Sequence, residues 1–288
     1  MNTIFRFALS RTRGQIIGWG VTIALLAWIV VWFYDPFKEQ QQQWIDLLKT
    51  FPKEIIGLFG DLNEMFSTKG YLDLQFFVFL PPLLGIFAVL AGSGLLVSDE
   101  ENGTLDLILA HPVSRTALLA GRGLAFVVVT VTILIMSWLG LVLPLGASSL
   151  TLTPGAAALP FVSLFGVVLF FGSLALLFSM VLPSRKLAAS AAGLLLVVSF
   201  FVSSLANFVR DLKGAAQLSP ISYYQSASAI NGLNTGWLIG LLAGAALFTG
   251  LAGWLFQRRD IRVAGEGSWR LPFVKRRNPR SEVERGKA

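Results

Sequence analysis

The sequence predicts an all-α polytopic membrane protein with six transmembrane helices. Of its 288 residues, 55% are hydrophobic and only 14% are charged, whereas soluble domains carry about 25% charged residues. The charged residues are also unevenly spread, because five windows that are each long enough to cross a bilayer contain none: 14–34, 74–98, 123–184, 187–209 and 214–257. A soluble fold would have to bury all five windows in one core, which excludes that class.

The N-terminal residues predict an interfacial helix followed by the first span. Within residues 1–13, one helical face gathers apolar side chains, which favours a short amphipathic helix in the inner membrane interface over a frayed terminus: Ile4, Phe5, Ala8 and Leu9. The first span is expected near 14–34. Its apolar run is too long for a signal peptide, and no small-residue cleavage site follows, so we expect it to remain uncleaved.

The next segment, 35–72, is expected outside the membrane. It carries two amphipathic patterns that predict two short surface helices, one on Trp44, Leu47, Leu48 and Phe51 and the other on Ile55, Phe59, Leu62 and Phe66. The second span is expected near 74–97. Pro81 and Pro82 lie inside it and predict a kink, which neighbouring helices in a membrane can accommodate.

The loop 98–122 carries the most distinctive local pattern. Ser98 followed by Glu101 is a capping box, which predicts the start of a helix. Leu105, Ile108 and Leu109 then form a small apolar face, and Pro112 ends the helix near Ala110. This apolar face could pack beneath its own bundle or dock into a partner, and the residues alone leave both interpretations open.

The remaining windows supply four spans. Pro144 and the polar stretch 146–155 divide the longest window, so spans are expected near 123–145, 158–182, 187–209 and 235–257. Residues 214–234 are uncharged but polar, and we interpret them as an external loop, with a re-entrant segment as the alternative. Glycines recur every fourth residue in the last span and predict close helix packing, either within the chain or at a subunit interface: Gly236, Gly240 and Gly244.

The distribution of basic residues predicts the orientation. Six spans put both termini on one side, and that side receives 17 of the 23 Lys and Arg residues. The positive-inside rule therefore places both termini in the cytoplasm, where the excess charge can meet anionic lipids. Residues 263–288 form a basic cytoplasmic tail that we expect to be flexible and not to bind nucleic acid.

Several chemistries are excluded by composition. The chain has no cysteine and one histidine, His111, so thiol catalysis and multi-histidine metal sites are excluded. No GxxxxGK[ST] sequence occurs, so the chain lacks this phosphate-binding loop. The expected spans contain no ionisable residue, which argues against an ion-coupled carrier acting alone.

The chain resembles the permease subunits of the ABC-2 family of ATP-binding-cassette transporters. The segment Glu100–Leu109, followed by Pro112-Val113-Ser114-Arg115, is similar to the family's E-x-x-G-T-L-x-x-L-L…P-V-S-R stretch. Arg122 stands where the family closes this loop with a basic residue. Leu218-Ser219-Pro220 with Tyr223-Tyr224 is similar to the family's external S-P-x-x-Y-Y segment.

This resemblance implies a transmembrane domain over 1–262, of the ABC-2 or type V exporter kind, with a coupling helix between spans 2 and 3. It implies a permease for efflux that pairs with a second permease subunit, a copy or a close homologue, and with two ABC ATPase subunits that bind ATP and Mg. The expected membrane is the plasma membrane of a bacterium or archaeon. A non-transporting membrane scaffold or assembly factor is the alternative.

The resemblance also assigns roles to residues. The family's external segment corresponds here to Ser219, Pro220, Tyr223 and Tyr224. No catalytic or metal-binding residue is expected. Coupling to the ATPase is expected from the loop and its flanks: Glu100, Glu101, Gly103, Thr104, Leu105, Asp106, Ile108, Leu109, Pro112 and Arg115.

Overall fold

The computed structural model describes residues 2–48, 65–101, 103, 114–206 and 209–258. Throughout these ranges the regular structure is helical and contains no strand. Six of its helical stretches are long and apolar enough to cross a membrane, which confirms the predicted all-α architecture: Arg13–Glu39, Thr68–Gly94, Arg115–Ala147, Pro154–Val181, Arg185–Leu205 and Thr235–Arg258.

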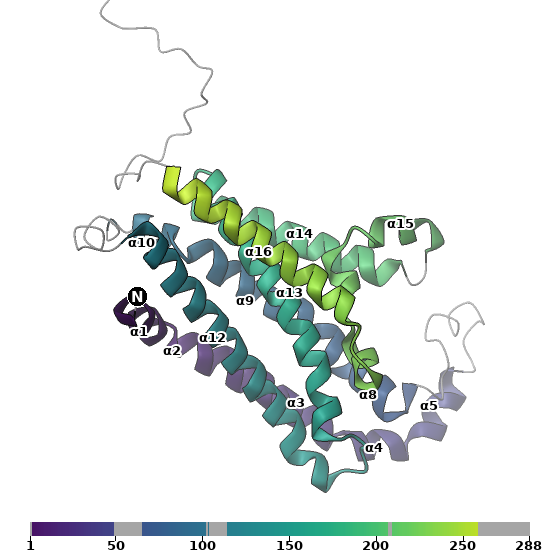
Figure 1. The fold of residues 1–288 in the computed structure, drawn as a ribbon. Coiled ribbons are helices and arrows are strands. Elements are labelled where there is room, and N and C mark those ends of the chain that lie inside the picture. The colour runs from purple at the N-terminus through teal and green to yellow at the C-terminus, as the bar shows by residue number, and fades with distance from the viewer. Residues whose placement is uncertain (1, 49–64, 102, 104–113, 207–208, 259–288) are drawn as a thin grey trace, which may run out of the picture.

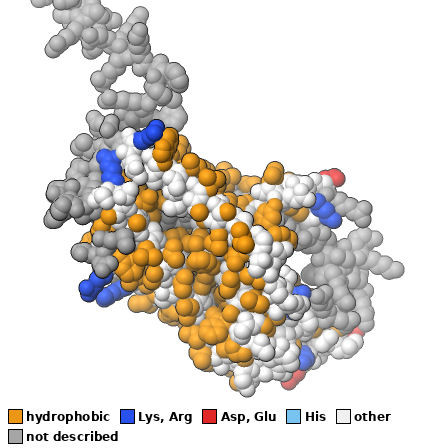
Figure 2. Space-filling view, viewed as in Figure 1, with side chains coloured by type: hydrophobic (Ala, Val, Ile, Leu, Met, Phe, Trp, Pro, Cys, Tyr) orange, Lys and Arg blue, Asp and Glu red, His pale blue; other side chains and the backbone are white. Residues whose placement is uncertain are grey.

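The spans form a bundle with two distinct ends (Figure 1). Helices α1 (Asn2–Arg11) and α10 (Val97–Glu101) lie at one end, called here the α10 end. Helices α4 (Tyr34–Glu39) and α8 (Thr68–Gln75) lie at the other, called the α8 end. On the face that Figure 2 shows, hydrophobic side chains cover the middle of the bundle, whereas the visible Lys and Arg lie toward its ends. This distribution is what a bilayer around the middle of the bundle requires.

The first span is longer than expected. It consists of α2 (Arg13–Gln15), a π-helical turn at Ile16–Val21, α3 (Thr22–Trp32) and α4. Residues 35–39, expected outside the membrane as a separate segment, thus continue the first helical stretch. Pro36 does not prevent this, because it lies in the first turn of α4, where a backbone N–H has no intrahelical partner. Helix α5 (Gln41–Leu48) follows, and the second surface helix expected on Ile55–Phe66 falls almost wholly outside the described residues.

The prolines of the second span do not kink a continuous helix. Helix α8 begins after Ser67, whose hydroxyl accepts a hydrogen bond from the backbone N–H of Gly70. The helix breaks at Phe76, and a short 3-10 turn at Phe77–Phe79 leads into α9 (Leu80–Gly94). Pro81 and Pro82 therefore lie in the first turn of α9, the position that tolerates proline best.

The next three spans are each started by a hydroxyl cap. Ser114 caps α12 (Arg115–Val142), Thr153 caps α13 (Pro154–Val181) and Ser184 caps α14 (Arg185–Leu205). The 3-10 turn Leu143–Ala147 extends α12 at the α8 end. Because α12 begins at Arg115, the expected loop 98–122 is too long. Only residues 102–114 lie between α10 and α12.

The polar region before the last span is folded rather than extended. Short helical segments at Arg210–Leu212, Lys213–Ala216 (α15), Pro220–Tyr223 (η5) and Ser226–Asn231 (η6) lead into α16 (Thr235–Arg258). Segment η6 packs against α8 and α13, and η5 packs against α14 and α16. Residues 214–234 therefore join several spans at the α8 end.

Helix α13 is the centre of the bundle. It contacts α9, α12, α14 and α16, and 67% of its most apolar window is buried, against 22% for α14 and for α16. A helix that is apolar on all sides is one that is buried on all sides. Val167, Val168 and Phe171 of α13 are fully buried in the main core.

Candidate functional site

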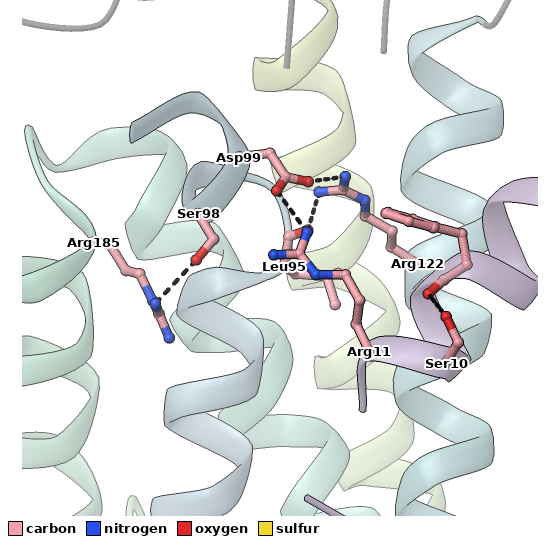
Figure 3. Close-up of polar contacts among 8 residues, drawn as sticks. Ser10, Arg11, Leu95, Ser98, Asp99, Arg122 and Arg185 are labelled. Atoms are coloured by element: carbon pink, nitrogen blue, oxygen red, sulfur yellow. Dashed lines mark hydrogen bonds and ion pairs between the residues drawn. The ribbon is translucent and has the colours of Figure 1, made fainter. Parts of the chain in front are cut away.

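A buried carboxylate organises the α10 end. Asp99 lies on α10 and is 3% exposed. It forms an ion pair with Arg122 of α12, which is 8% exposed, and its Oδ1 accepts a hydrogen bond of 3.1 Å from Nη1 of Arg11 on α1. Figure 3 shows the two guanidinium groups converging on this one carboxylate. Three elements that are distant in sequence are therefore joined at Asp99.

Arg122 has a second task in this network. Its Nη1 donates a hydrogen bond of 2.7 Å to the backbone carbonyl of Leu95, the C-cap residue of α9. Terminal carbonyls of a helix have no intrahelical partner and need one when buried. Arg122 thus satisfies the end of α9 and pairs with Asp99 on the helix that follows, which offsets the cost of burying its charge.

A third arginine holds α10 from the other side. The backbone N–H of Arg185, the first residue of α14, donates a hydrogen bond of 2.8 Å to Oε1 of Glu101. Its guanidinium donates to the hydroxyl of Ser98 at 3.0 Å and to the carbonyl of Leu90 at 3.2 Å. Figure 3 shows the contact between Arg185 and Ser98. Helix α10 is therefore fastened to α14 as well as to α1 and α12.

The start of α12 is tied to the end of the last span. Nη1 of Arg115 donates a hydrogen bond of 2.8 Å to the backbone carbonyl of Phe256, and its guanidinium lies 5.7 Å from the centre of the Phe256 ring. Cation–π contacts of this kind add to the hydrogen bond. Both flanks of residues 102–114 are thus attached to the spans, one through α10 and the other through Arg115.

Asp99 stays ionised in this setting. Burial by itself raises the pKa of the Asp99 carboxyl, but the opposite charges and hydrogen bonds of Arg122 and Arg11 outweigh burial and hold the pKa below its usual value. The network is therefore held by charge at neutral pH. Among the described residues there is no cluster of acidic or histidine side chains that could hold a metal ion.

A family comparison assigns the chain. The family model described as "ABC-2 family transporter protein" matches residues 9–261. The chain belongs to this family. It is a multi-pass membrane permease, the transport component that works with ABC ATPase partners. Comparison with curated protein sequences finds no significant match.

The structure describes only part of the expected coupling segment. Glu100 and Glu101 lie on α10, and Glu100 is buried. Gly103 follows in a turn with φ of +68°, a conformation that glycine adopts readily. Arg115 is the first residue of α12. The other six expected coupling residues lie outside the described residues: Thr104, Leu105, Asp106, Ile108, Leu109 and Pro112.

Two local predictions about this region were wrong. Ser98 does not start a helix as a cap; it lies inside α10, and its hydroxyl accepts a hydrogen bond from Arg185 instead. Arg122 does not close a loop; it lies two turns into α12 and is buried. The six expected spans contain no Asp, Glu, Lys or Arg, but the helices run past these windows, and α12 carries Arg115 and Arg122 near its start.

The expected external motif lies at the α8 end and connects spans. The Ser219 hydroxyl donates a hydrogen bond of 2.9 Å to the carbonyl of Ser199 on α14, and Pro220 begins η5. The Tyr223 ring packs edge-on against Trp237 of α16 at 5.8 Å, and the Tyr224 hydroxyl donates to the carbonyl of Phe77 at 3.3 Å. The motif therefore ties α14, α16 and the second span together.

The glycine row of the last span is only partly used within the chain. A Cβ on Gly244 would lie 2.7 Å from the Phe170 ring of α13, so this residue allows close approach. A Cβ on Gly236 would meet only Asn234 of its own segment, and one on Gly240 would meet nothing within 4 Å. Leu241 and Ala245, which are buried, carry the packing of α16 on the bundle.

Sequence reasoning missed the residues that build the network. Arg11 and Arg185 were used only as charges that set the orientation, and Asp99 was assigned no role. One signal was available, because Asp99 directly follows the uncharged window 74–98 and Arg122 directly precedes the window 123–184. Charges of opposite sign at the same membrane face of two successive spans can pair, although the sequence does not show that these two spans are neighbours.

Proposed function

We propose that the permease forms the translocation path of an exporter driven by two ATPase subunits, which dock on residues 102–114 at the α10 end. The observation that carries the proposal is the attachment of both flanks of this segment to the spans, through Asp99 on one side and Arg115 on the other. A motion imposed on a segment fixed in this way is passed to α1, α12, α14 and α16. The ATPase supplies ATP and Mg, and a second permease subunit completes the path.

The substrate class that fits best is apolar or amphipathic. A groove of about 780 Å³ lies between α12, α13 and α16. Its lining is mainly apolar, with large side chains such as Leu119, Phe126 and Leu176 and small residues such as Gly250 and Gly253. Among the residues that the structure describes, no Asp, Glu, Lys or Arg lines it. A surface without charges favours ligands that bury hydrocarbon.

Docking is tested on the apolar residues of the loop. Leu105→Ala together with Leu109→Ala should release the ATPase subunits and abolish ATP hydrolysis by the assembled complex. Burying a leucine contributes about 1.5–3 kcal/mol, and about 1.4 kcal/mol is tenfold in affinity, so losing two should weaken binding far more than tenfold. Co-purification of the ATPase with the tagged permease measures the effect.

The matched control removes two leucines at the opposite end. Leu143 and Leu218 are 65% and 87% exposed at the α8 end, so Leu143→Ala with Leu218→Ala should leave both readouts unchanged. Wild-type levels of ATPase binding and hydrolysis in the loop variant would show that the loop is not the docking element.

The orientation is tested by single cysteines, since the native chain has none. Gln43→Cys, Ala147→Cys and Asn231→Cys, all exposed at the α8 end, should react with a membrane-impermeant maleimide added to intact cells. Ser10→Cys and Lys186→Cys, exposed at the α10 end, should react only after the membrane is opened. Labelling of Lys186→Cys but not of Ala147→Cys in intact cells would show the opposite orientation.

A further inference from the structure

A cavity with one basic wall opens beside the Asp99 network. It has a volume of about 300 Å³ and lies between α1, α9 and α12. Three arginines and one carboxylate line it: Arg11, Arg122, Arg185 and Asp99. Its charge is therefore positive even after the ion pair is counted. Glu101, the other acidic group that contacts Arg185, does not line the cavity and accepts only from the backbone of that residue.

The arginines have donors to spare. A guanidinium carries five N–H groups. Within the described part of the chain, Arg11 donates to Asp99 alone, and Arg185 uses its two terminal nitrogens on one hydroxyl and one carbonyl. The side chain of Arg11 is 57% exposed. An anion at the mouth of the cavity can thus be bound without breaking the ion pair of Asp99 with Arg122.

The cavity is amphipathic along its depth. Its polar lining lies at the end of the bundle and includes Ser98 and Asp99 of α10 beside the three arginines. Phe87, Phe126 and Val129 line it along α9 and α12. Basic pockets between spans on the cytoplasmic side are sites where phospholipid headgroups bind. An apolar wall below the arginines suits the hydrocarbon next to such a headgroup.

We propose that this cavity binds a phosphate group through Arg11 and Arg185, with the phosphodiester of an anionic membrane lipid as its source. The bound phosphate bridges α1 and α14, each of which also bonds to α10. Arg122 has a different role from Arg11 and Arg185, because its guanidinium is held by Asp99 and the carbonyl of Leu95. This site goes beyond the proposed function, because it needs no ATPase.

The test uses the full-length permease, purified alone in an uncharged detergent. Phosphatidylglycerol added to the micelles should raise the melting temperature in a saturable manner, and native mass spectrometry should show retained lipid. Phosphatidylcholine, which has no net charge, should not produce this shift. Arg11→Gln with Arg185→Gln should raise the half-saturating lipid fraction by about tenfold or more, because charge-assisted hydrogen bonds to phosphate are the strong ones.

Matched controls have the same loss of charge. The control variant is Arg13→Gln with Lys186→Gln. Arg13 is two residues from Arg11 and Lys186 is next to Arg185, and both are exposed and do not line the cavity. This pair should bind phosphatidylglycerol like the wild type. If the control pair lost as much affinity for phosphatidylglycerol, the loss would be due to general surface charge, and the proposed site would be wrong.

The source of the phosphate is resolved by a soluble probe. Glycerol 1-phosphate should bind at the same arginines but much more weakly than the lipid, since it lacks the hydrocarbon that the apolar wall accepts. Binding of the two probes with equal affinity would assign the site to a soluble phosphate compound. The proposal would be overturned if neither probe bound, or if both probes bound the Arg11→Gln, Arg185→Gln variant as tightly as the wild type. This conclusion does not depend on the outcome of the ATPase experiment.

Discussion

Replacing Asp99 with alanine should lower the free energy of unfolding of the permease by about 3–5 kcal/mol. The variant leaves Arg122 buried without its carboxylate and releases Arg11 from α10. For a chain of this size, the loss corresponds to a fall in melting temperature of about 6–20 °C. Thermal unfolding of the purified permease in detergent measures it. As a control, Asp211→Ala removes an exposed carboxylate at the α8 end and should change stability by less than about 0.5 kcal/mol.

A double variant separates stability from coupling. A buried ion pair replaced by apolar residues of similar volume is often neutral or stabilising. Asp99→Leu with Arg122→Met should therefore recover part of the stability lost in Asp99→Ala, although the carbonyl of Leu95 loses its hydrogen bond from Arg122. It should not recover ATP hydrolysis by the assembled complex, because Arg11 and α12 are then no longer tied to α10 by charge. Recovery of both would show that the network only stabilises the fold.

The pH dependence of this difference has a defined sign. The pKa of Asp99 is lowered in the folded permease, so its stabilising contribution is complete above the ordinary pKa of aspartate, about 3.9. The contribution is lost only as the pH falls through the lower, folded pKa. The gap in stability between wild type and Asp99→Ala should thus be constant between about pH 8 and pH 5.

The sequence predicted the spans well because a bilayer imposes a simple demand, namely a long helix with few charges. It located the ends of the helices less well. The third helix was expected to begin after Arg122, the last charge before the apolar window, but it begins at Arg115 because Ser114 caps it there. A charge can lie inside a helix when a partner is near, and that partner is not visible in the sequence.

The candidate site shows the same limit. Asp99 is separated from Arg11 by 88 positions and from Arg122 by 23, so only the packing of α1, α9 and α12 brings them together. The loop motif near Glu100 was recognisable because its residues are contiguous. The contacts that Arg11, Arg122 and Arg185 make with α10 depend on which spans are neighbours. Hydropathy does not show which spans are neighbours.

Gly92→Ala should also lower the free energy of unfolding of the permease strongly. Helices α9 and α13 lie close together at this glycine, where an added Cβ would lie 2.0 Å from the backbone oxygen of Gly172. A backbone atom cannot rotate away as a side chain can, so the two helices must separate. Overpacking of this kind costs about 1–3 kcal/mol and occasionally more, and we expect the upper end of that range, because α13 is the centre of the bundle.

The control for this variant has the opposite expected sign. Gly193 lies in α14, and an added Cβ there meets nothing within 4 Å. Gly193→Ala should therefore be neutral or raise stability by up to about 1 kcal/mol, because alanine has less conformational freedom to lose on folding. Both variants are compared by thermal unfolding in the same detergent. If Gly92→Ala melts at the temperature of the wild type, α9 and α13 are farther apart than their glycines indicate.

If Gly92→Ala melts at a lower temperature, α10, which follows α9 directly, should also lose its fixed position against Arg122 and Arg185. Coupling in the assembled complex would then fall together with stability.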